Sequence, residues 1–317
     1  QKDSINSMEK IKIAVIAGPT ASGKTALGVE MAKAFDGEVI SADSMQIYKG
    51  MDIATAKPTA EEMQGIPHHL IDFLDRSQSF SVADYVELAN EKIQEISGRG
   101  HLPIIVGGTG LYISSLVDNV KFPDIKTSPE IRKRIEKEIE ESGAEAVFAK
   151  LEKYDPETAA ELHPNNLVRV IRALEVFELT GRKLSEFKAE SRLEESPYES
   201  VIIGLNFSDR QKLYDRINKR ADIMIENGLI AESKKVFESG EMKTAANAIG
   251  YKELIPYFRG EASLDECIDK IKQETRRYAK RQLTWFRHMD GVVWLDASAP
   301  DVTARAVQLT REFLAKG

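Results

Sequence analysis

Runs of apolar residues alternate with amphipathic stretches along most of this 317-residue chain. The first run, IKIAVIA at residues 11–17, is uninterrupted and rich in β-branched residues, which predicts a strand buried on both faces of a parallel sheet. The next segment, ALGVEMAKAF at residues 26–35, predicts a helix. Strands that alternate with helices are typical of an α/β fold with a parallel, doubly wound sheet flanked by helices. Further strands are predicted at EVISA (38–42), HLIDF (69–73), PIIVGG (103–108), VIIGLNF (201–207) and VVWLD (292–296).

The pattern changes between residues 122 and 200, where helical periodicity continues without a convincing strand. Because VIIGLNF then needs a sheet to join, we expect an all-helical insertion at residues 122–200 within a core made of residues 8–121 and 201–317. No apolar run is long enough to cross a bilayer. The polar start QKDSINSMEK has no signal-peptide core, so we expect residues 1–7 to be a leader or cloning remnant outside the fold.

The eight residues GPTASGKT, between the first strand and its helix, form a glycine-rich loop of the type that wraps phosphate oxygens. Gly18 and Gly23 allow the backbone conformations that turn N–H groups inward. Lys24 adds a positive charge, and the Thr25 hydroxyl is placed to bind Mg²⁺. The candidate phosphate-binding residues are therefore Gly18, Pro19, Thr20, Ala21, Ser22, Gly23, Lys24 and Thr25.

A second acidic ligand for Mg²⁺ is missing from the place where nucleotide-hydrolysing proteins keep it. Such proteins usually carry a carboxylate at the end of a neighbouring apolar strand. Here the strand PIIV ends in GGTGLY at residues 107–112, which contains no acidic residue. This argues against a motor ATPase or a switch GTPase.

Asp43 follows the strand EVISA directly, at the sheet edge where open α/β sheets bind ligands. Two interpretations are open: the side chain caps a turn, or it accepts a proton from a nucleophile beside the phosphate loop. Ser44, Gln46 and Tyr48 add hydrogen-bonding groups to the same turn, and Gln is a suitable bidentate partner for adenine.

The formal net charge of −7 conceals a basic segment, because residues 275–289 contain no acidic side chain. Ser263 and Glu266 have capping-box spacing and predict a helix start. On this helix one face is apolar, and the opposite face carries Arg277, Lys280, Arg281, Thr284 and His288. A face of one sign suits an RNA backbone, and an ordinary solvated face is the alternative. The single cysteine and five histidines show no disulfide framework or metal-ligand spacing.

A weaker basic face is predicted on the helix that follows HPNN at residues 163–166. Arg169 and Arg172 are three residues apart and share its outer side. Salt bridges from these arginines to Glu175 or Glu178 are the alternative to a contact with RNA.

Six segments together closely resemble the tRNA dimethylallyltransferases, also called tRNA isopentenyltransferases. They are GPTASGKT, ISADSMQIYKGMDIATAKP, VGGTGLY, HPNNLVRVIRALEVFELTG, NAIGYKEL and RRYAKRQLTWFR, and the resemblance extends from about residue 11 to residue 296. It implies a P-loop NTPase-like core whose helical insertion clamps the anticodon arm of tRNA. It also implies transfer of a dimethylallyl group from dimethylallyl diphosphate, held with Mg²⁺, to the exocyclic N6 amine of the adenosine 3′ of the anticodon. Diphosphate is released, and no ATP is hydrolysed.

The resemblance also implies roles for individual residues. Asp43 would be the general base, Thr109 would contact the tRNA and the leaving group, and Arg220 would be a second cation on the diphosphate. A cytoplasmic monomer without membrane contact is expected. The positions that correspond to tRNA contacts are Asp43, Ser44, Met45, Gln46, Thr109, Arg132, Val168, Arg169, Val170, Ile171, Arg172, Asn247, Ala248, Ile249, Gly250, Tyr251, Lys252, Gln273, Arg276, Arg277, Lys280 and Arg281.

Three other functions share part of this pattern. A P-loop kinase for a small molecule would consume ATP and leaves the basic helix unexplained. An adenylate-directed isopentenyltransferase would share the phosphate loop and Asp43, but it has no use for a tRNA-binding insertion. A non-catalytic RNA-binding protein would use nucleotide only as a switch.

Overall fold

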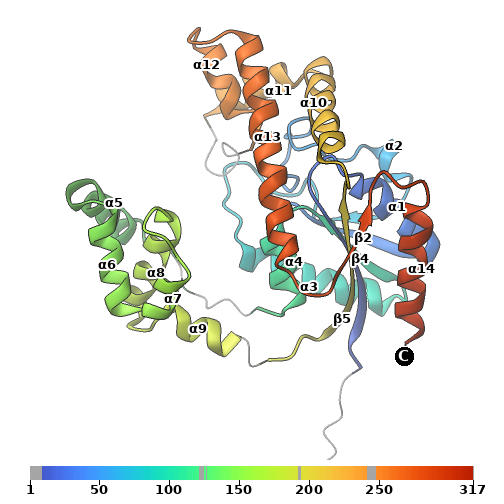
Figure 1. Ribbon diagram of the computed structural model, residues 1–317, viewed down its shortest axis with the longest axis horizontal. Coiled ribbons are helices and arrows are strands. Elements are labelled where there is room, and N and C mark those ends of the chain that lie inside the picture. The colour runs from blue at the N-terminus through green and yellow to red at the C-terminus, as the bar shows by residue number, and fades with distance from the viewer. Residues whose placement is uncertain (1–8, 121–124, 126, 192–193, 241–247, 317) are drawn as a thin grey trace, which may run out of the picture. The chain divides into compact units, whose positions relative to one another are not determined.

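Six parallel strands form the sheet around which the larger part of the chain is built (Figure 1). The structure is a computed structural model that describes residues 9–120, 125, 127–191, 194–240 and 248–316. The strand order is β3-β2-β4-β1-β5-β6, so the first strand lies in the middle of the sheet between β4 and β5. The strands are β1 (Ile11–Ala17), β2 (Gly37–Ala42), β3 (His68–His69), β4 (Leu102–Gly107), β5 (Tyr198–Asn206) and β6 (Val292–Asp296).

The predicted parallel sheet is confirmed, and one of its predicted strands is wrong in extent. The segment HLIDF at residues 69–73 contributes only His69 to β3, because Leu70 and Asp72 adopt left-handed backbone conformations with φ of 59° and 54°. An extended strand cannot continue through such residues. The chain instead turns back, and the N–H of Phe73 donates to the carbonyl of Ile47.

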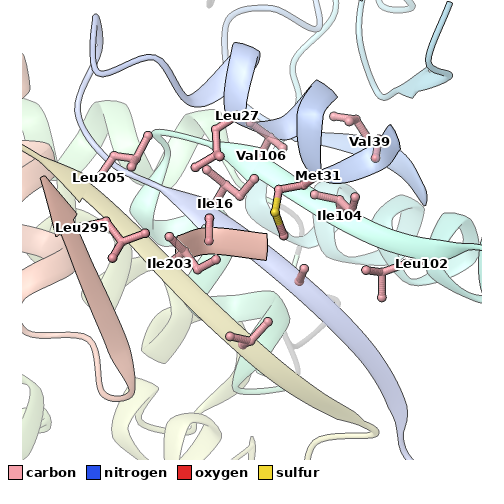
Figure 2. Close-up of a cluster of buried hydrophobic side chains, with 14 residues drawn as sticks. Ile16, Leu27, Met31, Val39, Leu102, Ile104, Val106, Ile203, Leu205 and Leu295 are labelled. Carbon is pink, nitrogen blue, oxygen red and sulfur yellow. The ribbon is translucent and has the colours of Figure 1, made fainter. Parts of the chain in front are cut away.

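Helices α1 (Lys24–Phe35) and α14 (Val302–Ala315) cover one face of the sheet, as Figure 1 shows. Figure 2 shows the core beneath them, where Leu27 and Met31 of α1 meet apolar side chains from the strands, among them Ile16, Val106 and Ile203. The near-continuous apolar sequence of β1 follows from this position, since a central parallel strand is buried on both sides.

The other face is covered by α3 (Val82–Gly98) and α4 (Gly110–Val117). Tyr85 of α3 and Tyr112 of α4 stack with ring centroids 4.2 Å apart. Because α4 begins directly after the loop that ends β4, this packing fixes the position of residues 107–110. The short helix α2 (Ala60–Met63) precedes β3.

A group of helices after β5 packs above the carboxyl ends of the strands. It comprises α10 (Arg210–Glu226), α11 (Leu229–Ser239), the 3₁₀ turn η2 (Lys252–Leu254), α12 (Ile255–Phe258) and the 24-residue α13 (Leu264–Arg287). The predicted capping box of Ser263 and Glu266 is confirmed at the start of α13. Its apolar face packs on α10 through Ala279 and Leu283, which meet Leu213 and Ile217.

The helical insertion forms a second compact unit, residues 118–196, while residues 1–117 and 197–317 form the first. The bounds predicted for the insertion, residues 122–200, lie too far toward the C-terminus, because β5 already begins at Tyr198. Its helices are α5 (Pro129–Ser142), α6 (Ala144–Tyr154), α7 (Pro156–Ala160), α8 (Leu167–Thr180) and α9 (Leu184–Ser191). Phe148, Leu151 and Leu174 lie in its own apolar core. The two ends of the unit meet where the Asn119 side-chain amide donates to the carbonyl of Glu195, at 3.2 Å.

In the part of the chain that the structure describes, no helix combines the length and apolar character needed to span a bilayer.

Candidate active site

The phosphate loop lies between β1 and α1, and its backbone is shaped to receive an anion. Gly23 has φ of +91° and precedes α1 without a side-chain cap, so the first N–H groups of the helix keep their hydrogen-bonding capacity for a ligand. The Ser22 hydroxyl is buried and has no hydrogen-bond partner among the described residues. Buried polar groups are almost always paired, so this hydroxyl is suited to a bound phosphate oxygen.

Two cations, Lys24 and Arg220, stand at this loop. The Lys24 ammonium donates to the carbonyl of Pro19 at 2.6 Å. Burial, and then the nearby Arg220 guanidinium, lower the pKa of Lys24 to about 7, against the opposing effect of the Asp43 carboxylate. Burial also lowers the pKa of Arg220, against the attraction of the Glu62 carboxylate and then of Asp43. Within the described residues neither cation forms an ion pair, so the site is deficient in negative charge.

Asp43 follows β2 in a turn that its own side chain stabilises. Its Oδ1 atom accepts from the N–H groups of Met45 at 2.8 Å and Gln46 at 3.2 Å. The turn-capping interpretation is therefore confirmed, and it does not exclude the other one. Among the described residues no donor pairs with Oδ2, and Asp43 lines the cavity, so this oxygen is able to accept a proton there.

Thr109 lies beside this turn because β2 and β4 are neighbours. The N–H of Ser44 donates to the Thr109 hydroxyl at 3.1 Å, and the N–H of Thr109 donates to the carbonyl of Ala42 at 3.1 Å. Gly107 has no room for a side chain, since a Cβ there would overlap the backbone of Ala42. The glycines of GGTG therefore allow Thr109 and Asp43, which are far apart in sequence, to share one edge of the sheet.

Gln46 has a different role in this structure from the adenine contact suggested by its residue type. Its side-chain amide donates to the carbonyls of Thr55 at 3.2 Å and Ala56 at 3.1 Å. The carboxylate of Glu232 accepts from the N–H groups of residues 52–54, between 2.9 and 3.1 Å. The segment DIATAKP is thus held by two side chains of the core.

A cavity of about 310 Å³ joins these groups, and all its lining residues belong to the sheet-containing unit. Its polar lining includes Thr20, Lys24, Thr25, Asp43 and Arg220. Its apolar lining includes Ala221, Met224, Leu229, Ile249 and Ile271, which come from α10, α11, the segment before η2, and α13 and gather in one apolar cluster. A ligand with a charged end and a short hydrocarbon chain matches this lining.

The donor atoms around the cavity fit a magnesium ion that shares its coordination with a substrate. Thr25 and Asp43 both line the cavity, and no cluster of three or more His, Cys, Asp or Glu side chains able to hold a metal occurs in the described ranges. Mg²⁺ commonly keeps several waters and binds one or two protein oxygens together with substrate phosphates. A hydroxyl and a carboxylate beside a phosphate loop meet that requirement.

The predicted basic face of α13 is confirmed as exposed, including Arg277, Lys280 and Arg281. Arg281 also lines the cavity, with its guanidinium 5.8 Å from the ring centroid of Tyr278. Arg276 lies instead at the contact with α10, donating to the Asn218 side chain at 2.6 Å. Gln273 accepts from Lys270 at 3.1 Å.

The segment NAIGYKEL contributes mainly buried groups. Ala248, Gly250 and Tyr251 are buried, and the Tyr251 hydroxyl donates to Glu232 at 2.7 Å. Ile249 is half-buried and Lys252 is exposed, and both line the cavity. Asn247 lies outside the described residues.

In the helical unit, the candidate RNA-binding arginines Arg132 and Arg172 both bind the buried carboxylate of Glu175, at 2.9 and 2.7 Å. The salt-bridge alternative for Arg172 is therefore the observed arrangement. Val170 and Ile171 pack in the core of the unit, so side-chain contacts from them to RNA do not fit the structure. Arg169 is exposed, and Val168 is 81% exposed.

Two residues of the site do not belong to the sequence-predicted set. The Tyr278 hydroxyl is hydrogen-bonded to Thr109 and Gln282, and burial, then the charge of Asp43, raises the pKa of this phenol. Gln282 is buried and lines the cavity. Both lie on α13 four residues apart, so the helical period places them on one face. Their position beside the basic face was the available signal.

Comparison with known proteins agrees with this site. The family model described as IPP transferase matches residues 46–289. A tRNA dimethylallyltransferase of Thermoanaerobacter sp. (strain X514) is 52% identical over 287 residues, which are 90% of this chain and 91% of the relative. The tRNA dimethylallyltransferase of Bacillus subtilis (strain 168) is 49% identical over 292 residues, 92% of each chain.

Solved structures show the same similarity. The tRNA isopentenylpyrophosphate transferase of Bacillus halodurans superposes with a TM-score of 0.71 at 48% identity, over 96% of both chains. A eukaryotic dimethylallyltransferase acting on tRNA superposes with a TM-score of 0.83 at 32% identity, over 96% of this chain and 79% of the other. The predicted P-loop NTPase-like fold and the predicted family are thus confirmed: this chain belongs to the IPP transferase family.

Proposed function

We propose that this chain transfers a dimethylallyl group from dimethylallyl diphosphate to the N6 amine of the adenosine 3′ of the anticodon in tRNA. The observation that carries the proposal is the composition of one cavity. It presents two unpaired cations, an adjacent carboxylate and an apolar wall. The names of the relatives, tRNA dimethylallyltransferases, support the same reaction. Since the substrate is tRNA, we expect the enzyme to act in the cytoplasm, as a monomer.

The donor would bind with its diphosphate in the phosphate loop. Lys24, Arg220 and the N–H groups at the start of α1 would oppose the negative charge that grows as the bond between C1 and oxygen breaks. The five-carbon chain would lie against the apolar cluster of α10, α11 and α13. Mg²⁺ bound at Thr25 and the diphosphate would neutralise part of the leaving group's charge.

The acceptor would meet the donor at Asp43 and Thr109. An adenine amine is a weak nucleophile, because its lone pair is delocalised into the ring. As the N6–C1 bond forms and the C1–O bond breaks, one amine proton would pass to Oδ2 of Asp43 and diphosphate would leave. Such a base contributes about 10²–10⁴ in rate. A stacked base cannot enter this cavity, so the adenosine must be extruded, with Arg277, Lys280 and Arg281 holding the RNA backbone.

A competition assay tests this function against the alternatives. The protein is incubated with labelled dimethylallyl diphosphate, ATP, AMP and a tRNA transcript, with a second transcript carrying guanosine at the target position as control. We expect label only in the first transcript, one diphosphate per transfer, and no loss of ATP. Label in AMP would indicate the adenylate-directed enzyme. ATP cleavage with unlabelled tRNA would favour a kinase or a nucleotide switch.

A further inference from the structure

One buried side chain of α13 connects the two loops on which the proposed reaction depends. Gln282 is 6% exposed. Its Oε1 accepts from the N–H of Thr20 in the phosphate loop at 2.9 Å, and its Nε2 donates to the carbonyl of Gly108 at 2.9 Å. The partners are 262 and 174 residues away in sequence. No other side-chain type of this length offers both a donor and an acceptor in one planar group.

The loop after β4 is shaped around this amide. A Cβ at Gly108 would overlap Nε2 of Gln282, and a Cβ at Gly110 would overlap the indole of Trp285. Tyr278, one turn before Gln282, is hydrogen-bonded to Thr109. Three residues of one helix face therefore hold three consecutive residues of the loop that carries Thr109.

The two loops lie on opposite sides of the proposed reaction. The phosphate loop holds the leaving group, and the Gly108–Thr109–Gly110 loop contacts the turn of Asp43 through Ser44. Displacement at the prenyl C1 requires the amine nitrogen to lie about 3–3.5 Å from C1, in line with the C1–O bond that breaks, and a misplacement of 1 Å can cost about 10²-fold in rate.

We propose that Gln282 is a positioning residue that sets the separation between the phosphate loop and the Thr109 loop, and so aligns donor and acceptor. This inference rests on the proposed function. Gln282 touches neither the transferred group nor the accepting amine in this role, because its polar atoms are already bonded to Thr20, Gly108 and the Tyr278 hydroxyl. Among the basic residues of α13, Arg277 and Lys280 are exposed, and Arg281 lies beside Gln282 over the ring of Tyr278, so loss of the amide removes none of their charge.

Two substitutions separate the two hydrogen bonds. Gln282→Met removes both at similar size. Gln282→Glu keeps an acceptor for the Thr20 N–H but sets a carboxylate oxygen against the Gly108 carbonyl. Gln308→Met is the matched control, since Gln308 is exposed on α14 and its amide donates to Glu312 on the same helix. Each protein is assayed by single turnover with saturating dimethylallyl diphosphate and tRNA, and the rate is expressed per diphosphate-binding site counted by calorimetry.

We expect the single-turnover rate to fall at least tenfold in both Gln282 variants, with tRNA Kd within threefold of the parent and no change in Gln308→Met. Diphosphate affinity should fall in both variants, because Gln282→Met loses the Thr20 bond and Gln282→Glu places a negative charge beside the phosphate loop. A purely structural role would lower the unfolding temperature and the number of sites but not the rate per site. Rates within twofold of the parent in both variants would overturn the proposal.

Gly108→Ala changes the contact between Gly108 and Gln282 at the loop instead of at the helix. It tests the positioning role if neither Gln282 variant folds. Its methyl group should displace the amide and slow turnover, and adding Gln282→Ala should cause little further loss, since residues in contact are not additive. Fully additive losses would contradict the inference. The unsubstituted protein in the same assay reports on the proposed function by itself: absence of prenyl transfer there would refute that function and not the role of Gln282.

Discussion

Two pairs of cationic side chains, one in each unit, have opposite electrostatic surroundings. Arg132 and Arg172 share the carboxylate of Glu175, which is fully buried and also accepts from the N–H of Ser128 at 2.7 Å. Lys24 and Arg220 have no such partner in the described chain, and their pKa values are lowered by burial. An unpaired cation at a cavity is costly to the fold and is therefore typical of a site that receives an anion. The pairing state, more than the number of positive charges, separates a binding site from a structural one.

The largest effect is expected when the carboxylate of Asp43, which lines the cavity with the unpaired cations, is removed. Asp43→Asn keeps an oxygen for the turn bonds to Met45 and Gln46, so the fold should be intact. We expect kcat to fall a hundredfold or more, as loss of a general base does, while diphosphate binds as well as before or more tightly. Steady-state kinetics and calorimetry measure both. Asp301→Asn, in an exposed position before α14, is the control, and turnover close to normal in Asp43→Asn would refute the role of the base.

Removal of one unpaired cation should have the next largest effect. Lys24→Met should weaken binding of diphosphate by about 30-fold, since hydrogen bonds to charged groups contribute about 1.5–3 kcal/mol. With Lys24 present, binding above pH 7 requires uptake of a proton, because its pKa is about 7 without ligand and an adjacent anion raises it. Affinity should therefore decline as pH rises above 7.

Diphosphate itself titrates with pH, and the Lys24→Met protein controls for this, because it lacks only the contribution of the lysine. The slope of diphosphate affinity against pH should differ between the two proteins above pH 7 and should be the same below pH 7. The stability of the ligand-free protein should change with pH in the opposite direction to the binding affinity. The cost of burying a charged lysine is present below pH 7, and it is relieved as pH rises from 7 to the ordinary pKa of 10.5. Equal slopes in both proteins would show that Lys24 does not titrate in the site.

The paired arginines should respond in stability. Glu175→Gln removes the charge that Arg132 and Arg172 share, and we expect the free energy of unfolding to fall by about 1.5–3 kcal/mol, as for loss of charged hydrogen bonds. Urea unfolding followed by circular dichroism measures it. Glu178→Gln changes a partly exposed partner of Arg134 on the same helix and should cost less than 0.5 kcal/mol, in the range of surface pairs. Equal losses of unfolding free energy in the two variants would contradict a structural role for the buried Glu175 pairs.

The smallest effect is expected on the exposed face of α13. Arg281→Glu should weaken tRNA binding by about fivefold and make its dependence on salt less steep, because fewer phosphates are neutralised. Filter binding over a series of salt concentrations gives the slope. Arg305→Glu, exposed on α14, makes the same charge change outside the proposed interface. An unchanged slope in Arg281→Glu would place the RNA elsewhere.

Periodicity and motif spacing predicted the parallel sheet, the phosphate loop and the exposed face of α13, because each depends on local sequence. They did not predict that β3 ends at His69, since a left-handed conformation at the following leucine is imposed by tertiary contacts. They left the pairing of Arg172 open, because the choice between Glu175 and RNA depends on burial. The position of Gln282 beside the basic face was visible in the sequence, but its hydrogen bonds were not, since its partners are backbone groups of two distant loops.

The bond between Asn119 and Glu195 bears on how the chain is assembled during synthesis. β1 cannot pair with β5 until β5 has been synthesised, and β5 emerges from the ribosome only after the whole helical unit. If that unit folds on its own core first, its two ends are already joined, and the sheet closes across a short effective loop. The entropic cost of pairing β1 with β5 is then set by the few residues that link the helical unit to the sheet and not by the full length of the insertion.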